Sequence, residues 1–173
     1  MNIEIEVKAR CSDLVKLKKS LKKIGARRIG KIHQVDTYFL LSPKHRYRWA
    51  PRLRIREHWP KGKSFLEYHE PINKFKAREF EVAVNDPKTV KLILKKLGYL
   101  REAIIDKVRE KYTYQGLHID VDQVKGLGKF IEVECMKNRK DSLKRIYNFY
   151  IKLGISPKDL IPEKRYLDMT WEK

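Results

Sequence analysis

The stretch Ile3-Glu4-Ile5-Glu6-Val7-Lys8-Ala9 decides the fold, because apolar and charged residues alternate along it without a break. A period of two places the odd-numbered apolar residues on one face, and Glu4, Glu6 and Lys8 on the other. This pattern predicts a half-buried β-strand with one fully charged face. Since antiparallel sheets often leave one face in water, a single row of this kind indicates no more than a wet surface.

The order of predicted elements repeats once along the chain. Leucines at helical spacing follow Ser12 and Asp13, which offer an N-cap, and Gly25 is placed to end that helix. Asp86 and Pro87 give a second helix the same kind of start. Each half is therefore predicted to run strand, helix, strand, strand, strand. The predicted strands cover about 3–9, 29–41, 52–56, 64–70, 78–84, 103–114, 117–124 and 129–135, and a further helix covers 143–153.

Charge recurs on one face of several of these strands, which a plain solvated sheet does not require. Some rows are cationic and others are acidic. Eight antiparallel strands can close into a barrel whose interior takes every second residue. We therefore expect an α+β fold: a closed eight-stranded antiparallel β-barrel of two βαβββ-like halves with flanking helices, as a single domain over residues 1–173. The rows are Arg52, Arg54 and Arg56; Lys107, Arg109 and Lys111; Asp120 and Asp122; and Glu132 and Glu134.

The chain is strongly basic, with 41 Lys and Arg against 22 Asp and Glu and a net charge of +19. This balance indicates either a polyanionic partner or a lysine-rich solvated surface of the kind found in thermophiles. No run of 18 apolar residues and no secretory signal occur, so no membrane association is expected. Cys11 and Cys135 match no disulfide or metal framework, and we expect a cytoplasmic protein.

Rows of both signs inside one barrel would favour a particular class of ligand. Arginine forks match phosphate oxygens, whereas grouped carboxylates need a cation between them to stay ionised. Oxygen ligands suit Mg²⁺ or Mn²⁺, which bridge substrate phosphates. A nucleic-acid surface would gain nothing from carboxylates beside its arginines. The pattern therefore predicts a metal-bound polyphosphate compound, and nucleic acid is not expected.

Ordered motifs over nearly the whole chain resemble the CYTH superfamily of triphosphate tunnel enzymes. Glu4-Ile5-Glu6-Val7-Lys8 resembles its Glu-x-Glu-x-Lys signature. The family includes class IV adenylyl cyclases, thiamine triphosphatases and inorganic tripolyphosphatases, and the last block and the length are most similar to the cyclases. The further matching blocks are Gln34–Phe39, Leu53–Arg56, Lys76–Glu81, Lys107–Arg109 with Tyr112, and Asp122–Glu134.

The resemblance implies roles for named residues. Glu4, Glu6 and Lys8 would be catalytic. The triphosphate would be bound by Lys8, Arg54, Arg56, Lys76, Arg78, Lys107 and Arg109, and the divalent Mg or Mn ion by Glu4, Glu6, Glu81, Asp122, Glu132 and Glu134.

Three functions are weighed. The first is a class IV adenylate cyclase-like enzyme that converts ATP to cyclic AMP and pyrophosphate. The second is a hydrolase of inorganic tripolyphosphate or an organic triphosphate such as thiamine triphosphate, and the third is a non-catalytic polyanion or nucleic-acid binder. Glu6→Ala or Arg56→Ala is expected to abolish turnover and leave the fold intact. A homodimer is left open.

Two positions depart from the family pattern. His69-Glu70-Pro71 stands where the family usually has Lys-Gly-Pro, and Arg165-Tyr166 stands where it often has Ser-Tyr. A histidine near neutral pH cannot fully replace a fixed ammonium group. We therefore expect phosphate to be bound more weakly at His69. At Arg165 we expect either a change in a segment that covers the site or no effect.

Overall fold

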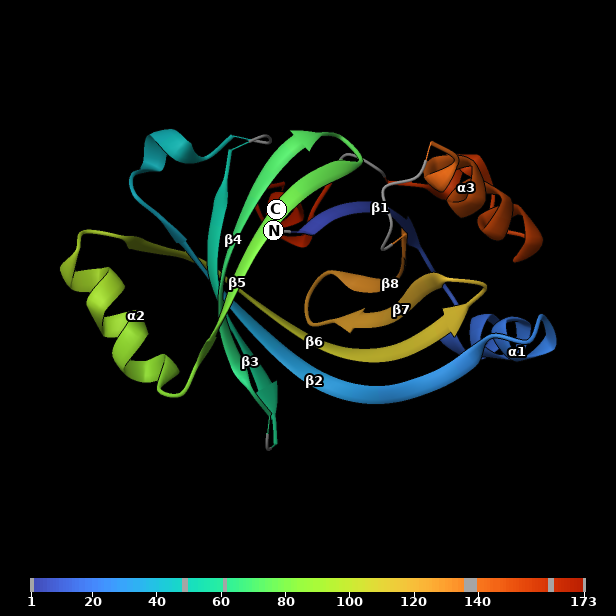
Figure 1. Ribbon diagram of the computed structural model, residues 1–173, viewed down its shortest axis with the longest axis horizontal. Coiled ribbons are helices and arrows are strands. Elements are labelled where there is room, and N and C mark those ends of the chain that lie inside the picture. The colour runs from blue at the N-terminus through green and yellow to red at the C-terminus, as the bar shows by residue number, and fades with distance from the viewer. Residues whose placement is uncertain (1, 48–49, 61, 136–139, 162–163, 173) are drawn as a thin grey trace.

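Eight β-strands close into one antiparallel barrel in the computed structural model (Figure 1). The structure describes residues 2–47, 50–60, 62–135, 140–161 and 164–172. Around the barrel the strands follow the order β1-β5-β4-β3-β2-β6-β7-β8. Their bounds are β1 Asn2–Arg10, β2 Arg27–Leu40, β3 Arg52–Trp59, β4 Ser64–Asn73, β5 Lys76–Val84, β6 Leu100–Tyr114, β7 Leu117–Val124 and β8 Gly128–Cys135.

The predicted fold class is confirmed, including the repeat of strand, helix and three strands. Strand β1 closes the barrel, because its first residues pair with β5 and its later residues pair with β8. The strand at each end of the second half, β5 or β8, therefore lies beside the first strand of the chain. Full closure leaves no strand edge along this sheet.

In the described parts of the chain, four α-helices and two 3₁₀ turns surround the barrel. Asp13 caps the first helix by accepting hydrogen bonds from the amides of Val15 and Lys16, at 2.8 and 3.0 Å. Asp86 caps the second helix through the Thr89 amide, with Pro87 in the first turn, as the sequence predicts. The bounds are α1 Leu14–Lys23, α2 Pro87–Lys96, α3 Ser142–Lys152, α4 Tyr166–Thr170, η1 Pro43–His45 and η2 Pro157–Asp159.

The hydrophobic core lies between the outside of the barrel and these helices. Val7 and Ile131 on the outer rows of β1 and β8 belong to the same buried cluster as Ile146 and Tyr150 of α3. The Tyr150 hydroxyl donates to the Val7 carbonyl at 2.7 Å. Because the apolar rows are used on the outside, the alternate rows of each strand are left to face the barrel interior.

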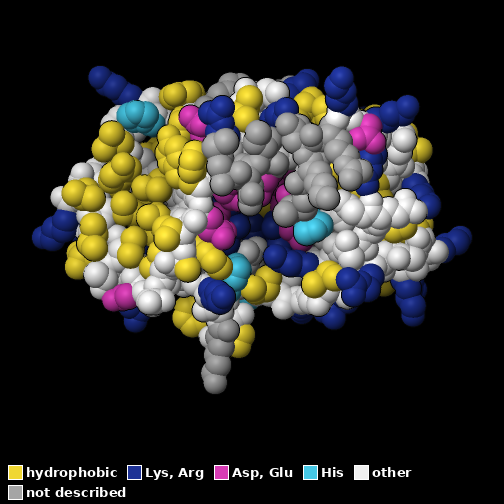
Figure 2. Space-filling view, viewed as in Figure 1, with side chains coloured by type: hydrophobic (Ala, Val, Ile, Leu, Met, Phe, Trp, Pro, Cys, Tyr) yellow, Lys and Arg dark blue, Asp and Glu magenta, His cyan; other side chains and the backbone are white. Residues whose placement is uncertain are grey.

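The α2 helix covers its part of the barrel less fully. Leu94 is buried in a cluster with Ile55, but Ile93 and Leu97, apolar residues at helical spacing on the same helix, are 50% and 65% exposed. Figure 2 shows hydrophobic side chains gathered over this side of the molecule. Among the described residues, no helix has the length and apolar character needed to cross a bilayer.

Candidate active site

A cavity of about 960 Å³ lies inside the barrel and is lined by residues from all eight strands. In Figure 2 it is the central hollow, with Lys, Arg, Asp and Glu side chains at its walls. The volume falls within the range of roughly 300–1,000 Å³ usual for small-molecule sites. Most of the predicted site residues line it: Glu4, Glu6, Lys8, Arg54, Arg56, Lys76, Glu81, Lys107, Arg109, Glu132 and Glu134.

Arg78 is not brought to this cavity, and its predicted contact with phosphate is corrected. Glu79 and Glu81 of β5 line the cavity, so the side chain between them points to the outer face. There Arg78 is 45% exposed and donates to Glu70 at 3.0 Å. The alternation of β5 in the sequence already carried this signal.

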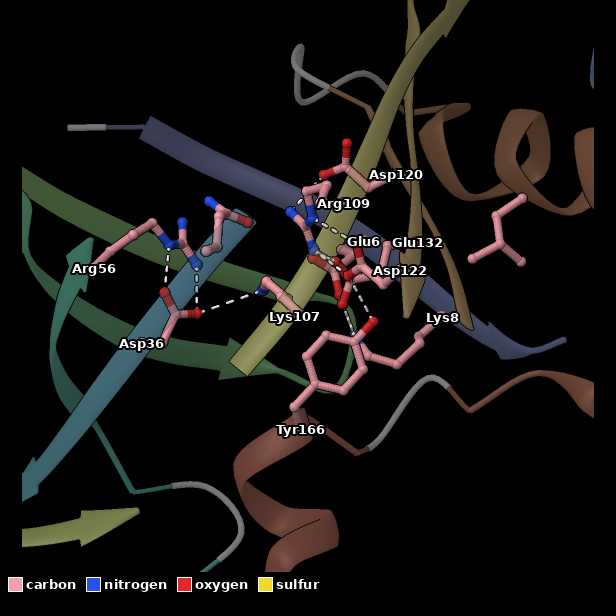
Figure 3. A network of polar contacts seen from close by, with 12 residues as sticks. Glu6, Lys8, Asp36, Arg56, Lys107, Arg109, Asp120, Asp122, Glu132 and Tyr166 are labelled. Carbon is pink, nitrogen blue, oxygen red and sulfur yellow. Dashed lines mark hydrogen bonds and ion pairs between the residues drawn. The ribbon is translucent and has the colours of Figure 1, made fainter. Parts of the chain in front are cut away.

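One ion network joins β1, β6, β7 and β8 (Figure 3). The Arg109 guanidinium donates to both oxygens of Asp122, at 2.8 and 2.5 Å, and also to Asp120 at 2.5 Å and to Glu132. The Lys8 ammonium donates to Glu6 at 2.9 Å and to Glu132. Although burial opposes it, these carboxylates hold the pKa of Arg109 well above its usual value. Both cations are therefore fixed in place and stay charged.

Asp122 and Glu132 are both paired with cations in this arrangement, and their roles as metal ligands stay predictions. Both oxygens of Asp122 are occupied, since Oδ2 also accepts from the Tyr166 hydroxyl at 2.8 Å. The two oxygens of Glu132 accept from Lys8 and Arg109. These carboxylates position the cations.

A second ion network surrounds the arginines of β3. Arg56 holds Asp36 through two bonds of 2.8 and 3.1 Å. Arg54 donates to Glu67 at 2.5 Å and to Glu79 at 3.1 Å. Asp36 and Glu67 are completely buried. Burial would raise the pKa of Asp36, but Arg56 and Lys107 hold it well below its usual value.

The sequence reasoning missed these three acids as site residues. Glu79 shares the inner face of Glu81 on β5, which was a usable signal. Asp36 lies directly opposite Arg56 in the β2–β3 ladder, and Glu67 lies opposite Arg54 in the β3–β4 ladder. These pairings depend on the strand register, which the sequence does not state.

Lys107 and Tyr166 lie where the two networks meet (Figure 3). The Lys107 ammonium lies 3.4 Å from Asp36 and 5.1 Å from the centre of the Tyr166 ring. The Lys8 ammonium lies 4.4 Å from the same ring. Burial and Arg109 lower the pKa of Lys107. Its charge is thus poorly compensated, and a bound anion would stabilise it.

Carboxylates form another part of the wall. Glu6 and Glu134 are direct partners across β1 and β8. Burial and the neighbouring Glu79 raise the pKa of Glu4 to about 10, and burial and Glu6 raise that of Glu134 to about 7. The Oε1 atom of Glu134 is buried, and no described residue forms a hydrogen bond with it. Oxygen atoms in this condition suit a hard divalent cation.

The carboxylates are not a finished metal cage. Within the described part of the chain, no three His, Cys, Asp or Glu side chains are arranged to hold an ion. Mg²⁺ is often held by one or two carboxylates and completed by substrate phosphates and water. Glu4, Glu6 and Glu134 fit that second kind of site, and the cavity-lining Glu81 is exposed.

The two departures from the family pattern both lie at this cavity. His69 lines it from β4, and burial and Arg54 lower the pKa of His69 to about 3. Arg165 lines it beside α4 and donates from its side chain to Asp168 at 3.0 Å. His69 is therefore neutral, whereas Arg165 brings an additional cation to the wall.

Comparison with known proteins identifies the family to which the chain is similar. The CYTH domain model matches residues 2–163. A Methanocaldococcus jannaschii protein named as a candidate adenylate cyclase is 36% identical over 174 residues, covering 96% of this chain and 98% of that protein. The solved PH1012 protein of Pyrococcus horikoshii superposes with a TM-score of 0.86 and 27% identity, over 95% of this chain and 98% of that one.

A more distant structure has the same fold. It is HpAC1 of Hippeastrum, described as a candidate adenylyl cyclase with a dominant triphosphatase activity. Its TM-score is 0.66 at 17% identity, over 90% of this chain and 89% of that one. The family model and the M. jannaschii relative each cover nearly all of the chain. The chain therefore belongs to the CYTH domain family.

Proposed function

We propose that this protein is a divalent-metal-dependent enzyme that cyclises ATP to cyclic AMP and pyrophosphate inside the barrel. One observation carries the proposal: fixed cations and metal-type carboxylates face the same enclosed cavity. Phosphoryl transfer needs both, because its catalysis consists mainly of positioning and of stabilising charge on phosphate oxygens.

The cations would bind the triphosphate. Lys8 and Arg109 are immobilised by carboxylates, so little reorganisation is needed when an anion enters. Lys107 gains most from the anion, because its charge is the least compensated of the three. Arg54 and Arg56 extend the cationic surface from β3, and Lys76 adds to it at the start of β5.

Glu4, Glu6 and Glu134 would hold Mg²⁺ or Mn²⁺ beside these cations. When bound, the ion would neutralise charge on the substrate phosphates. The carboxylates themselves fix where the ion, and with it the phosphate chain, can lie. The unpartnered Oε1 of Glu134 supports their assignment.

In the proposed reaction the ribose 3′-hydroxyl oxygen attacks the α-phosphorus, and the bond to the leaving pyrophosphate breaks. The name of the M. jannaschii relative supports this choice. Hydrolysis of a triphosphate is the second candidate, since the same contacts would serve an attacking water. The activity described for HpAC1, which shares the fold, favours keeping that candidate.

Binding of nucleic acid is the weaker alternative. The cations that distinguish this chain lie inside the barrel among carboxylates, where a duplex cannot reach. Much of the remaining positive charge lies on exposed surface, for example Lys22 and Lys23 at the end of α1. The partner is therefore proposed to be a small triphosphate compound.

Purified protein with Mg²⁺ or Mn²⁺ tests the proposal. ATP should yield cyclic AMP and pyrophosphate, and chelation should stop the reaction. Orthophosphate from ATP or tripolyphosphate, without cyclic AMP, would establish the second candidate. Glu70→Gln on the outer face is the matched control for Glu6→Gln in the cavity. Absence of turnover together with salt-sensitive RNA binding would contradict both enzymatic candidates.

A further inference from the structure

His69 is a neutral hydrogen-bonding side chain in a cavity otherwise dominated by charges. It belongs to the inward row of β4, directly opposite Arg52 of β3 and Glu79 of β5. Its Nδ1 atom is buried and has no hydrogen-bond partner among the residues that the structure describes. A buried polar atom left in this condition costs about 1–3 kcal/mol, so its presence needs an explanation.

The surroundings of His69 suggest what kind of partner is absent. Arg54, Arg165 and Arg56 act together against protonation of the ring, and only Glu79 favours it among its main neighbours. The cationic side chains near it are already paired: Arg54 with Glu67 and Glu79, and Arg165 with Asp168. A phosphate at His69 would therefore meet guanidinium groups that carboxylates already hold.

Two of the neighbouring inward positions are uncharged, although the direct partners Arg52 and Glu79 carry charge. Pro71 follows His69 along the same row of β4, and Ala77 of β5 is its direct partner. Both line the cavity. His69, Pro71 and Ala77 thus form a part of the wall that offers small apolar contacts and one hydrogen-bonding nitrogen.

We propose that His69 binds an uncharged hydroxyl group of the substrate through Nδ1, so that the cavity prefers an organic triphosphate to inorganic tripolyphosphate. This inference rests on the proposed function and adds the class of substrate to it. A hydroxyl can accept from or donate to a neutral imidazole, whichever nitrogen carries the proton. The organic part of the substrate then lies against Pro71 and Ala77, and the phosphates lie toward Lys8, Lys107 and Arg109.

Three substitutions separate this role from a structural one. His69→Asn keeps a polar atom near the place of Nδ1, His69→Leu removes it at similar size, and His69→Lys supplies an ammonium group. Because Nδ1 has no partner within the described structure, His69→Leu should be no less stable than the wild type. A loss of thermal stability in His69→Leu would instead indicate a structural role.

The quantity measured is the ratio of kcat/KM for ATP to kcat/KM for tripolyphosphate. For each substrate all phosphate-containing products are counted, whether they arise by cyclisation or by hydrolysis. His69→Leu should lower this ratio about tenfold, mainly through ATP, and His69→Asn should stay within threefold of the wild type. His69→Lys should lower the ratio about tenfold by improving tripolyphosphate. Each tenfold change in the ratio corresponds to about 1.4 kcal/mol of activation free energy.

An unchanged ratio in all three variants would overturn the role of His69, as would equal losses with both substrates. A wild-type enzyme that turns over only tripolyphosphate would overturn it as well. A wild-type protein that turns over neither compound with any divalent metal contradicts the proposed function itself, which is a distinct result.

Discussion

Glu6 of β1 and Glu134 of β8 are direct partners in the barrel ladder, and both side chains line the cavity. Two carboxylates of like charge therefore face each other, an arrangement that destabilises the sheet when nothing lies between them. A divalent cation would let both ionise at neutral pH. The strain of this pair is a measurable property of the metal-free protein.

Glu134→Gln should become stabilising as the pH rises. Burial and Glu6 raise the pKa of Glu134 to about 7 from 4.5. The folded protein thus binds more protons than the unfolded chain between those values, and stability falls as the pH rises through them. The variant lacks this loss, which amounts to roughly 3 kcal/mol at full extent.

Thermal unfolding with a chelator present measures this effect as the difference in Tm between variant and wild type. The difference should grow from about pH 4.5 to about pH 7 and then level off. Subtracting the wild type removes the opposing contribution of His69, whose pKa is lowered in the folded protein. Glu70→Gln on the outer face gives the control. A difference that is constant from pH 5 to pH 7.5 would contradict the assigned environment of Glu134.

Glu6 and Arg56 should respond differently to substitution, although the sequence predicted an intact fold for both alanine variants. The Glu6 side chain is 41% exposed, so Glu6→Gln should lose at least 100-fold in turnover with little change in stability. Arg56→Ala leaves the completely buried Asp36 without its two-bond partner. Unpairing a buried charge costs about 3–5 kcal/mol.

Urea unfolding of both variants checks this contrast. Arg56→Lys is the better probe of turnover, because it keeps the positive charge and loses only the paired geometry. Equal midpoints for Arg56→Ala and the wild type would show that Asp36 does not depend on Arg56.

Lys107→Gln should weaken substrate binding without weakening the fold. The pKa of Lys107 is lowered by burial and by Arg109, so its charged form opposes folding at neutral pH. The variant should be at least as stable as the wild type, with KM raised at least tenfold. Lys125→Gln is the control, since Lys125 is exposed in the turn between β7 and β8 and is not among the described residues that line the cavity. Steady-state kinetics measure the change in KM, and thermal unfolding measures the change in Tm. An unchanged KM would show that Lys107 does not contact the phosphates.

The hydroxyl and the ring of Tyr166 make separate contacts in the site, and substitutions can test them separately. Its hydroxyl donates to Asp122 at 2.8 Å, and its ring lies beneath the ammonium groups of Lys8 and Lys107. Tyr166→Phe keeps the ring and should lose about 1 kcal/mol of stability, with a small loss of kcat/KM. Tyr166→Leu loses both parts and should raise KM further. Identical kinetics for the two variants would argue against the ring contacts.

The inward rows of the barrel could be predicted because a period of two fixes which residues share a face. That rule found Glu4, Glu6 and Lys8, and it also explains why Arg78, between Glu79 and Glu81, points outward. Arg78 was assigned to phosphate binding from the family resemblance, although the alternation along its strand predicts an outward side chain.

Partners across strands could not be predicted in the same way. Whether Asp122 faces a metal or Arg109 depends on the register of β6 and β7, which is set by the whole barrel. The exposure of Ile93 and Leu97 likewise depends on how much of α2 the barrel covers. Helical spacing predicts a stripe but not the width of the surface beneath it.

Closure of the barrel through β1 has a consequence for synthesis of the chain. Strand β1 leaves the ribosome before the other seven strands of the barrel, but its partner β8 ends only at Cys135, and Tyr166 follows later still. Until then the edge of β1 that later meets β8 and the free edge of β7 are unpaired and open to other chains. A chain that ends before β8 therefore lacks the closed barrel interior and has two unpaired strand edges that can pair with other chains. We expect such a chain to aggregate or to be degraded, and not to act as a weak enzyme.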